Sequence, residues 1–209
     1  MSNVVDQYGW QSSTGPESCG YITPEVLHIL KRLKVVRVCD LGSGNGALAN
    51  AMQGAGFQPA GVEYDKQGVE IAQKNYPSIN FYHFGVQDDP AQVLAAEGQA
   101  FDAVVSTEVV EHLFSPHLLP IFARQIVREG GYLVISTPYH GYLKNLALSI
   151  FNSWDKHHTA LWHGGHIKFW SRKTLTKLLE ENGFRVIEFQ GAGRLPWLWK
   201  SMILIARAV

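Results

Sequence analysis

The sequence has 209 residues, of which 46% are hydrophobic and 17% are charged. This composition is typical of a single globular domain and excludes a disordered chain. Eighteen Lys and Arg residues balance eighteen Asp and Glu residues, so no overall positive charge favours a nucleic-acid partner.

The two cysteines and the two ends of the chain indicate where the protein works. Cys19 and Cys39 are too few for a disulfide scaffold and fit a reducing compartment. The first fifteen residues have neither the basic nor the apolar region of a signal peptide. Leu195–Ala206 is apolar, but it is about twelve residues long and a bilayer span needs about 20. We therefore expect a cytoplasmic protein without a membrane span.

The first predicted elements are a helix and a strand. Thr23–Leu33 has Thr23 as a capping residue, Pro24 at its first helical position and a shared apolar face. Val35–Leu41 is rich in β-branched residues and ends in glycines, which predicts a strand.

Helices and strands alternate along the next part of the chain. Predicted helices cover residues 47–53, 66–75, 91–97 and 116–128, and predicted strands cover residues 58–64, 79–84, 101–106 and 131–136. This alternation predicts a parallel, doubly wound α/β sheet. The near-continuous apolar runs in its later strands are typical of strands buried on both faces.

The alternation stops after the fifth strand. Residues 138–170 form a long connection crowded with aromatic residues and histidines, before a helix at 172–182 that Gly183 ends. Two successive strands follow at 184–190 and 200–206, which could pair antiparallel. We expect one domain over residues 1–209, divided into an N-terminal segment and helix (1–34), a cofactor-binding core (35–137), a candidate substrate lid (138–170) and a final helix with strands (171–209).

A glycine-rich turn follows the first strand. Gly42, Gly44 and Gly46 allow a tight turn and the close approach of a ligand, although an ordinary loop can also be rich in glycine. Glu63 ends the second strand, 17 residues after Gly46. A carboxylate at this place can accept hydrogen bonds from both hydroxyls of a ribose. Together these residues favour a nucleotide-like ligand.

Two details favour a methyl donor over a dinucleotide. Asp40 comes just before the loop, where it would repel a pyrophosphate but attract the ammonium of an amino-acid group. The spacing is also Gly-x-Gly-x-Gly, whereas dinucleotide sites have Gly-x-Gly-x-x-Gly. A sulfonium donor with an α-amino group therefore fits better than NAD.

Three segments carry a family resemblance. DLGSGNG with Glu63, FGVQDDP and FDAVVSTEVVEHLFSP resemble class I S-adenosylmethionine-dependent methyltransferases, and the last is similar to the ubiquinone-biosynthesis O-methyltransferase-like branch. The resemblance covers about residues 35–137. It implies S-adenosylmethionine as cofactor and a Rossmann-like, seven-stranded, mostly parallel sheet whose last strand is antiparallel.

The resemblance also assigns cofactor contacts by position. Its expected cofactor-binding residues are Asp40, Gly42, Ser43 and Gly44 around the methionine part, Glu63 and Tyr64 at the ribose, Val86 and Gln87 at the adenine, and Thr107 and Glu108 at the lip after the fourth strand. Ser43 stands where many relatives have cysteine. The segment GVQDD departs from the commoner pattern and leaves open whether Gln87 or Asp88 reaches the adenine.

Methyl transfer is an in-line displacement, so the protein must mainly position the acceptor. If the acceptor is a hydroxyl, a histidine can serve as its base. The candidate catalytic residues are His112, His140 and His166. Residues 138–170 either form a substrate lid with an aromatic pocket or pack on the sheet without a role in catalysis.

A metal is the least supported part of the site. Glu108, Glu111 and His112 are spaced to share one side of a helix, if the segment is helical. In relatives that methylate polyprenyl catechols, this set is associated with a divalent metal; alternatively, His112 has only a structural role. A zinc site from His157, His158, His163 and His166 lacks cysteines and a recognisable spacing. We therefore predict no metal ligands.

The sequence thus predicts methyl transfer from S-adenosylmethionine to a small-molecule acceptor, on an oxygen of an aromatic, lipid-like or sugar-derived compound. The alternatives are an NAD(P)-dependent oxidoreductase and a non-catalytic S-adenosylmethionine-binding partner protein. The sequence does not identify the acceptor, the oligomeric state or the atom that is methylated.

Overall fold

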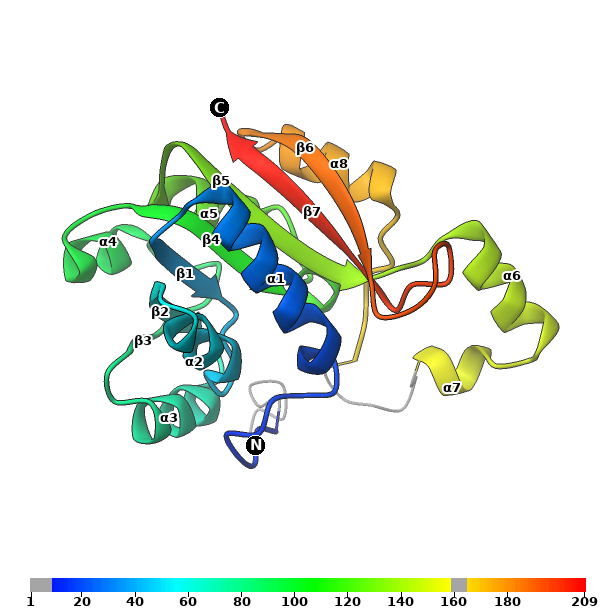
Figure 1. Ribbon diagram of the computed structural model, residues 1–209, viewed down its shortest axis with the longest axis horizontal. Helices are drawn as coiled ribbons and strands as arrows, with labels where there is room; N and C mark the ends of the chain where they lie inside the picture. Colours follow the sequence, from blue (N-terminus) through cyan, green and yellow to red (C-terminus); the bar gives the residue numbers. More distant parts are fainter. Residues whose placement is uncertain (1–8, 159–164) are drawn as a thin grey trace.

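A computed structural model describes residues 9–158 and 165–209 of the chain (Figure 1). Tyr8, Trp162 and His163, which belong to segments considered above, lie outside the described residues. The strands are β1 (Arg37–Leu41), β2 (Gln58–Glu63), β3 (Asn80–His83), β4 (Phe101–Thr107), β5 (Val127–Pro138), β6 (Phe184–Ala192) and β7 (Ser201–Ala208). The helices are α1 (Cys19–Leu33), α2 (Ala47–Gly54), α3 (Lys66–Asn75), α4 (Ala91–Glu97), α5 (Leu118–Ile126), α6 (Tyr142–Ile150), α7 (Trp154–His158) and α8 (Arg172–Glu180), with a short 3₁₀ helix η1 (Val110–His112).

The strands form one seven-stranded sheet in the order β3-β2-β1-β4-β5-β7-β6. The first five strands run parallel, and β7 pairs antiparallel with both β5 and β6. The predicted doubly wound sheet with an antiparallel last strand is therefore confirmed. The strand order reverses between β1 and β4, which is where open α/β sheets bind ligands.

Helices cover both faces of the sheet (Figure 1). On one face α1, α2 and α3 pack on inward side chains such as Val105, Val134 and Ile203. On the other face α4, α5 and α8 pack on their neighbours in the strands, such as Val104 and Leu204. Because successive strand residues point to opposite faces, the apolar runs in β4, β5 and β7 fill both cores.

The first helix begins earlier than the sequence predicted. It starts at Cys19, so Thr23 is not its cap and Pro24 lies inside it. Cys19 N–H donates a hydrogen bond to the Pro16 carbonyl, and Ile22 N–H donates one to the Ser18 carbonyl. The chain is therefore already helical before Thr23. Pro24 cannot donate to the carbonyl four residues earlier, but that residue is Gly20, which is exposed, so water can satisfy the carbonyl.

The predicted helix over 116–128 is also corrected at its end. Helix α5 stops at Ile126, and Val127 begins a twelve-residue β5 by pairing with Phe101 of β4. The β-branched Val127 favours extended backbone over a further helical turn. The two glycines after Glu129 accommodate the shift in register between β4 and β5.

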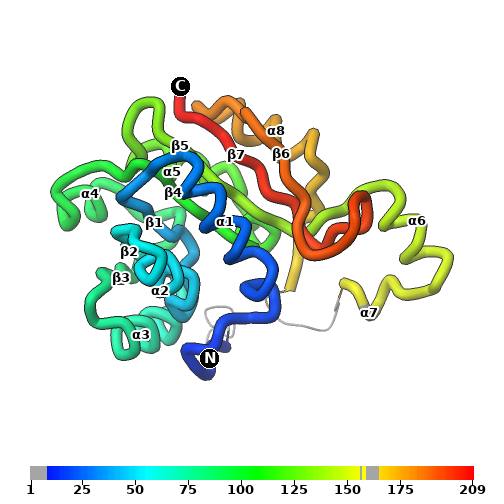
Figure 2. Tube along the Cα trace, in the orientation of Figure 1, coloured from blue at the N-terminus to red at the C-terminus, as the bar shows by residue number. Residues whose placement is uncertain are grey.

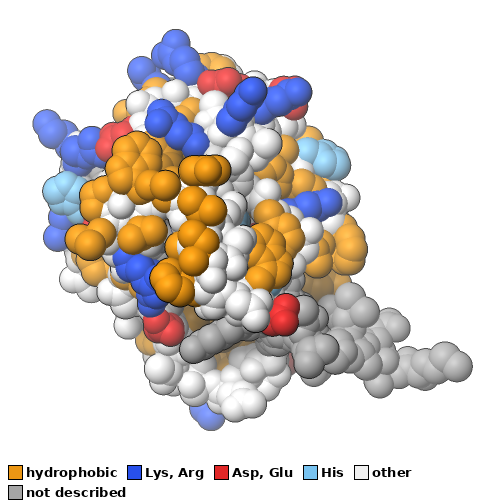
Figure 3. All heavy atoms as spheres, turned by 90° about the vertical axis from the view of Figure 1, so that its right-hand side faces the viewer, with side chains coloured by type: hydrophobic (Ala, Val, Ile, Leu, Met, Phe, Trp, Pro, Cys, Tyr) orange, Lys and Arg blue, Asp and Glu red, His pale blue; other side chains and the backbone are white. Residues whose placement is uncertain are grey.

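The insertion after β5 extends away from the sheet. Helices α6 and α7 project beyond the C-terminal end of β5 (Figures 1 and 2). Apolar side chains gather on this side of the molecule (Figure 3), and exposed ones include Tyr142, Leu146, Ile150, Phe151 and Trp154. Among the residues described, no helix is both long and apolar enough to cross a membrane.

The core facing α5 provides a test of the fold. Phe122 is 1% exposed, whereas the preceding Ile121 is 37% exposed on the same helix. We expect Phe122→Ala to lower the free energy of unfolding by about 3–5 kcal/mol, because it leaves a cavity. Ile121→Ala, the matched control, should cost less than about 1 kcal/mol. Urea unfolding measures both, and equal losses would contradict this packing.

Candidate active site

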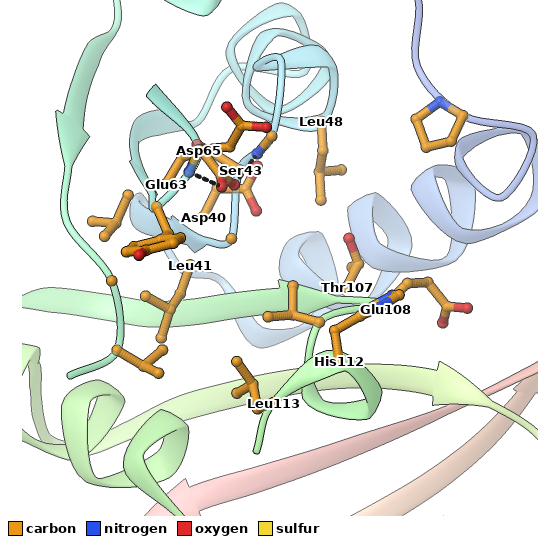
Figure 4. A pocket seen from close by; sticks show the side chains of 18 of the residues that line it. Asp40, Leu41, Ser43, Leu48, Glu63, Asp65, Thr107, Glu108, His112 and Leu113 are labelled. Carbon is orange, nitrogen blue, oxygen red and sulfur yellow. Dashed lines mark hydrogen bonds between the residues drawn. The ribbon is translucent and has the colours of Figure 1, made fainter. Parts of the chain in front are cut away.

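A cavity of about 1050 Å³ lies at the carboxyl ends of β1, β2 and β4. Pockets for drug-sized ligands usually measure about 300–1,000 Å³, so this one has room for a cofactor and a second molecule. Figure 4 shows that Asp40, Ser43 and Glu63 lie on one side of it and Glu108, His112 and Leu113 on the other. Every predicted cofactor-binding residue lines this cavity: Asp40, Gly42, Ser43, Gly44, Glu63, Tyr64, Val86, Gln87, Thr107 and Glu108.

The glycine loop is folded tightly against β2. Gly42 N–H and Ser43 N–H both donate to the carbonyl of Val62, over 2.7 and 3.1 Å. Gly42 has a φ of 85°, and a Cβ there would lie 2.4 Å from a methyl group of Val109. A side chain at this position is therefore excluded by both conformation and space.

Asp40 is a buried carboxylate without a partner. Its side chain is 1% exposed, and neither oxygen has a hydrogen-bond partner among the described residues. Burial raises the pKa of Asp40 to about 7, and the negative charge of Glu63 adds to the rise. A buried carboxylate usually requires a compensating donor or cation. The ammonium of an amino-acid ligand would supply both.

Glu63 accepts hydrogen bonds from two backbone groups. Its two oxygens each accept one N–H, from Gly44 and from Asp65, at 2.7 Å. Burial raises its pKa, and these two hydrogen bonds oppose the rise. Because each carboxylate oxygen has two lone pairs, the group can still accept two hydroxyls. The two backbone hydrogen bonds therefore fix the orientation of the Glu63 carboxylate in the cavity.

The structure separates Gln87 from Asp88. Gln87 lines the cavity next to Val86. Asp88 instead turns back and accepts the N–H of Gly85 at 2.7 Å, while its own N–H donates to the Gly85 carbonyl. Asp88 thus shapes the turn, whereas Gln87 lines the cavity.

The N-terminal segment covers the glycine loop. Asn45 donates from its side-chain amide to the carbonyls of Ser12 and Thr14, both over 2.8 Å. This contact brings Trp10 over the loop, where a Cβ on Gly44 would lie 2.4 Å from the indole ring. A side chain at Gly44 would therefore meet Trp10. Asn45 was missed because a loop asparagine carries no pattern of its own.

The lip after β4 differs from the helical arrangement considered above. Glu108 has a φ of 55° and lies outside η1, so Glu108, Glu111 and His112 do not share one side of a helix. The Glu108 carboxylate accepts the hydroxyls of Ser136 and Ser201, over 2.8 and 3.1 Å. Burial raises its pKa to about 7, against these two hydrogen bonds.

His112 and His166 meet at the far end of the cavity. Both line it, and their rings form an edge-to-face contact with centroids 4.9 Å apart. His112 Nδ1 lies 3.3 Å from the carbonyl of Gly165. Because a carbonyl only accepts, Nδ1 carries the proton and Nε2 the lone pair. Burial and the proximity of His112 lower the pKa of His166 to about 4.

Glu111 anchors the return of the insertion. Its backbone carbonyl accepts the N–H groups of Ile167 and Lys168, and its buried carboxylate accepts the hydroxyl of Thr137 at 3.0 Å. Ligand atoms of Glu111, His112 and His166 lie within 4.8 Å of one another. His166 therefore replaces Glu108 as the third member of the carboxylate–histidine set considered from the sequence.

His140 lies apart from the other two candidate bases. It does not line the cavity, and its ring contacts His157, His158 and Phe169 instead. Burial and the nearby positive charge of Lys144 lower its pKa to about 4. The structure thus brings two of the three candidate bases to the cavity.

Comparison with known proteins gives three kinds of match. Residues 18–189 match the family model described as a methyltransferase domain. The ubiquinone biosynthesis O-methyltransferase of Roseobacter denitrificans is 30% identical over 177 residues, which are 80% of this chain and 68% of that protein. The enzyme of the same name from a Ruegeria species is 28% identical over the same shares of the two chains.

Solved structures share the fold at lower identity. Magnesium protoporphyrin IX methyltransferase from Synechocystis PCC 6803, with bound SAH, superimposes with a TM-score of 0.64 at 19% identity, over 90% of this chain and 82% of that one. Human N-acetylserotonin methyltransferase in complex with SAM gives a TM-score of 0.67 at 17% identity, over 92% of this chain and 53% of that one.

The contacts of Glu63 predict a large effect on ligand binding. We expect Glu63→Ala to weaken binding of S-adenosylhomocysteine by about 100-fold or more, because hydrogen bonds to a charged group contribute about 1.5–3 kcal/mol each. Glu70→Ala, which removes an exposed carboxylate from α3, is the matched control. Calorimetry measures both, and wild-type affinity in Glu63→Ala would refute the assignment.

Asp40 predicts how binding depends on pH. The ionised carboxylate attracts an ammonium, so the Kd for S-adenosylhomocysteine should fall by up to about tenfold per unit between pH 5 and 7, then level off. In the ligand-free protein the sign is opposite: the folded state holds the proton more tightly, so this group lowers the free energy of unfolding as pH rises from about 4 to 7.

Asp40→Asn isolates this contribution. The variant should bind S-adenosylhomocysteine weakly with a flatter pH profile, and at pH 8 its ligand-free form should unfold at a higher temperature than the wild type. Calorimetry and thermal unfolding at pH 5 and 8 test the two effects. A variant with the wild-type profile would show that Asp40 does not face the ligand.

Proposed function

The chain belongs to the class I S-adenosylmethionine-dependent methyltransferase family, and we propose that it methylates an oxygen of a small aromatic or lipid-like acceptor. The cofactor follows from membership of the family. The acceptor class is supported by the similarity to proteins named as ubiquinone biosynthesis O-methyltransferases and by the lining of the cavity.

The single observation that carries the proposal is the division of one cavity into two chemically different ends. Around β1 and β2 it offers the orphaned Asp40 carboxylate, the glycine loop and Glu63. Around the loop after β4 it offers Leu113, Phe114 and the two histidines, His112 and His166. The first end fits an adenosyl amino acid. The second fits an apolar acceptor with a hydroxyl that has to lose a proton.

The two ends of the cavity also argue against the two alternatives. A pyrophosphate at the loop would lie near two buried carboxylates, which is unfavourable for an NAD(P)-dependent oxidoreductase. A non-catalytic binding protein has no need of a second cavity end with a positioned histidine. The described structure therefore favours a catalytic role.

In the proposed mechanism the methyl group arrives from the sulfonium and the protein orients the acceptor oxygen. When bound, the cofactor supplies the electrophilic methyl carbon. The Gly165 carbonyl holds the His112 Nδ1–H, so Nε2 can accept the proton of the acceptor hydroxyl. We propose that residues 138–170 cover this end, because Ile167 and Lys168 of their returning segment are tied to η1 through the Glu111 carbonyl.

An acceptor screen tests the function. Phenols and catechols with alkyl tails of increasing length, glycosides and amines would each be incubated with S-adenosylmethionine, and release of S-adenosylhomocysteine measured with and without a chelator. We expect turnover with phenolic or catecholic hydroxyls and none with amines. Turnover of amines alone would refute O-methylation, while cofactor binding without any turnover would favour the partner-protein alternative.

The base is tested by His112→Asn. An asparagine amide can still donate to the Gly165 carbonyl but cannot take a proton, so kcat should fall by about 10²–10⁴-fold with the best acceptor. Affinity for S-adenosylhomocysteine should stay within about threefold, because the cofactor end is untouched. His117→Ala, an exposed histidine nearby, is the control. A His112→Asn enzyme with wild-type kcat would contradict the assignment.

A further inference from the structure

Three histidines converge where the insertion folds back on itself. His140 follows the end of β5, whereas His157 and His158 end α7. One ligand nitrogen from each lies within 4.8 Å of the other two. The ring centroids of His157 and His158 are 4.8 Å apart, and those of His140 and His158 are 5.6 Å apart. His140 and His157, which are 17 positions apart in the sequence, thus lie together with His158 in one cluster.

The surroundings of this cluster are those of a ligand site. Phe169 contacts both His140 and His158 edge to face, and Trp154 lies against His158 with ring centroids 4.2 Å apart. His158 Nε2 is buried and has no hydrogen-bond partner in the described part of the chain. A buried imidazole nitrogen without a partner is costly unless something binds it.

We propose that His140, His157 and His158 bind one divalent transition-metal ion, with zinc the best fit. Three imidazoles with one open position form a common tetrahedral zinc environment. Nitrogens at about 2.0–2.1 Å from one tetrahedral ion lie about 3.3 Å from one another. Zinc binding would therefore require the three ligand nitrogens to move about 1–2 Å closer together.

Such an ion would tie the end of α7 to the end of β5. His158 also lines the large cavity, so the open coordination position would border the acceptor end. This site is separate from the Glu111, His112 and His166 group of the active site, and it does not depend on the proposed function because metal binding is measured without turnover.

Two neighbouring cations, Lys144 and Arg194, oppose the ion. Lys144 is buried on α6, its ammonium donates to the Lys200 carbonyl at 3.3 Å, and its charge acts on all three histidines. Arg194 also acts on His157, and Glu108 attracts Lys144 from the other side. Removing the lysine charge should therefore strengthen metal binding.

The experiment titrates the chelator-treated full chain with Zn²⁺ by calorimetry and records the visible spectrum after loading with Co²⁺. We expect one tightly bound ion and the intense absorption of four-coordinate cobalt. His158→Ala and His140→Ala should each weaken zinc binding by about 100-fold or more. Lys144→Met should strengthen zinc binding severalfold. A cluster that only packs the insertion together would not bind zinc more tightly in this variant.

Two controls locate the ion. His117→Ala should bind zinc like the wild type, and circular dichroism should show that the His158→Ala chain remains folded. A wild-type chain that takes up no zinc overturns the proposal. So does loss of zinc in His112→Asn with retention in His158→Ala, because the ion would then belong to the active-site group.

Discussion

The site depends on one constraint, the burial of the Asp40 and Glu63 carboxylates at the ends of two adjacent strands. The β1–β2 ladder places Asp40 opposite Gly61, close to where Glu63 ends β2. Glu63 is held by the N–H groups of Gly44 and Asp65, whereas Asp40 has no such partner. The ligand-free fold therefore keeps an unfavourable charge that a cationic ligand group relieves. If the amino-acid end of the cofactor binds here, as proposed, the folded chain prepares part of its binding energy in advance.

The sheet order turns this local arrangement into a binding site. Because β1 is flanked by β2 and β4, the crevice opens above β1, where the glycine loop leaves it. The hydrogen bonds from Gly42 and Ser43 to the Val62 carbonyl hold the loop against β2. The same order places the loop after β4, with Val109 against Gly42, opposite the carboxylates. Cofactor end and acceptor end therefore come from strands that are adjacent in space and distant in sequence.

Much of this could be predicted because local patterns determine it. The apolar strands, the glycines and Glu63 each have a signal within a short window, and the structure places all ten predicted cofactor residues on one cavity. Other features depend on distant partners. The left-handed Glu108 is stabilised by Ser136 and Ser201, which come from β5 and β7. The early start of α1 and the cover formed by Trp10 depend likewise on tertiary contacts, which local propensity does not report.

Among the residues that the structure describes, the returning segment of the insertion is hydrogen-bonded to η1 and not to the glycine-loop end of the cavity. This segment donates two backbone hydrogen bonds to the Glu111 carbonyl, and Trp170 donates to the Val110 carbonyl at 3.4 Å. Any shift of residues 165–170 must therefore move η1 and with it His112, whereas Asp40 and Glu63 are held by β1, β2 and the glycine loop. Under the proposed function, changes in the insertion would alter the acceptor end of the cavity and leave the glycine-loop end in place. Such a separation would let one cofactor core serve different acceptors.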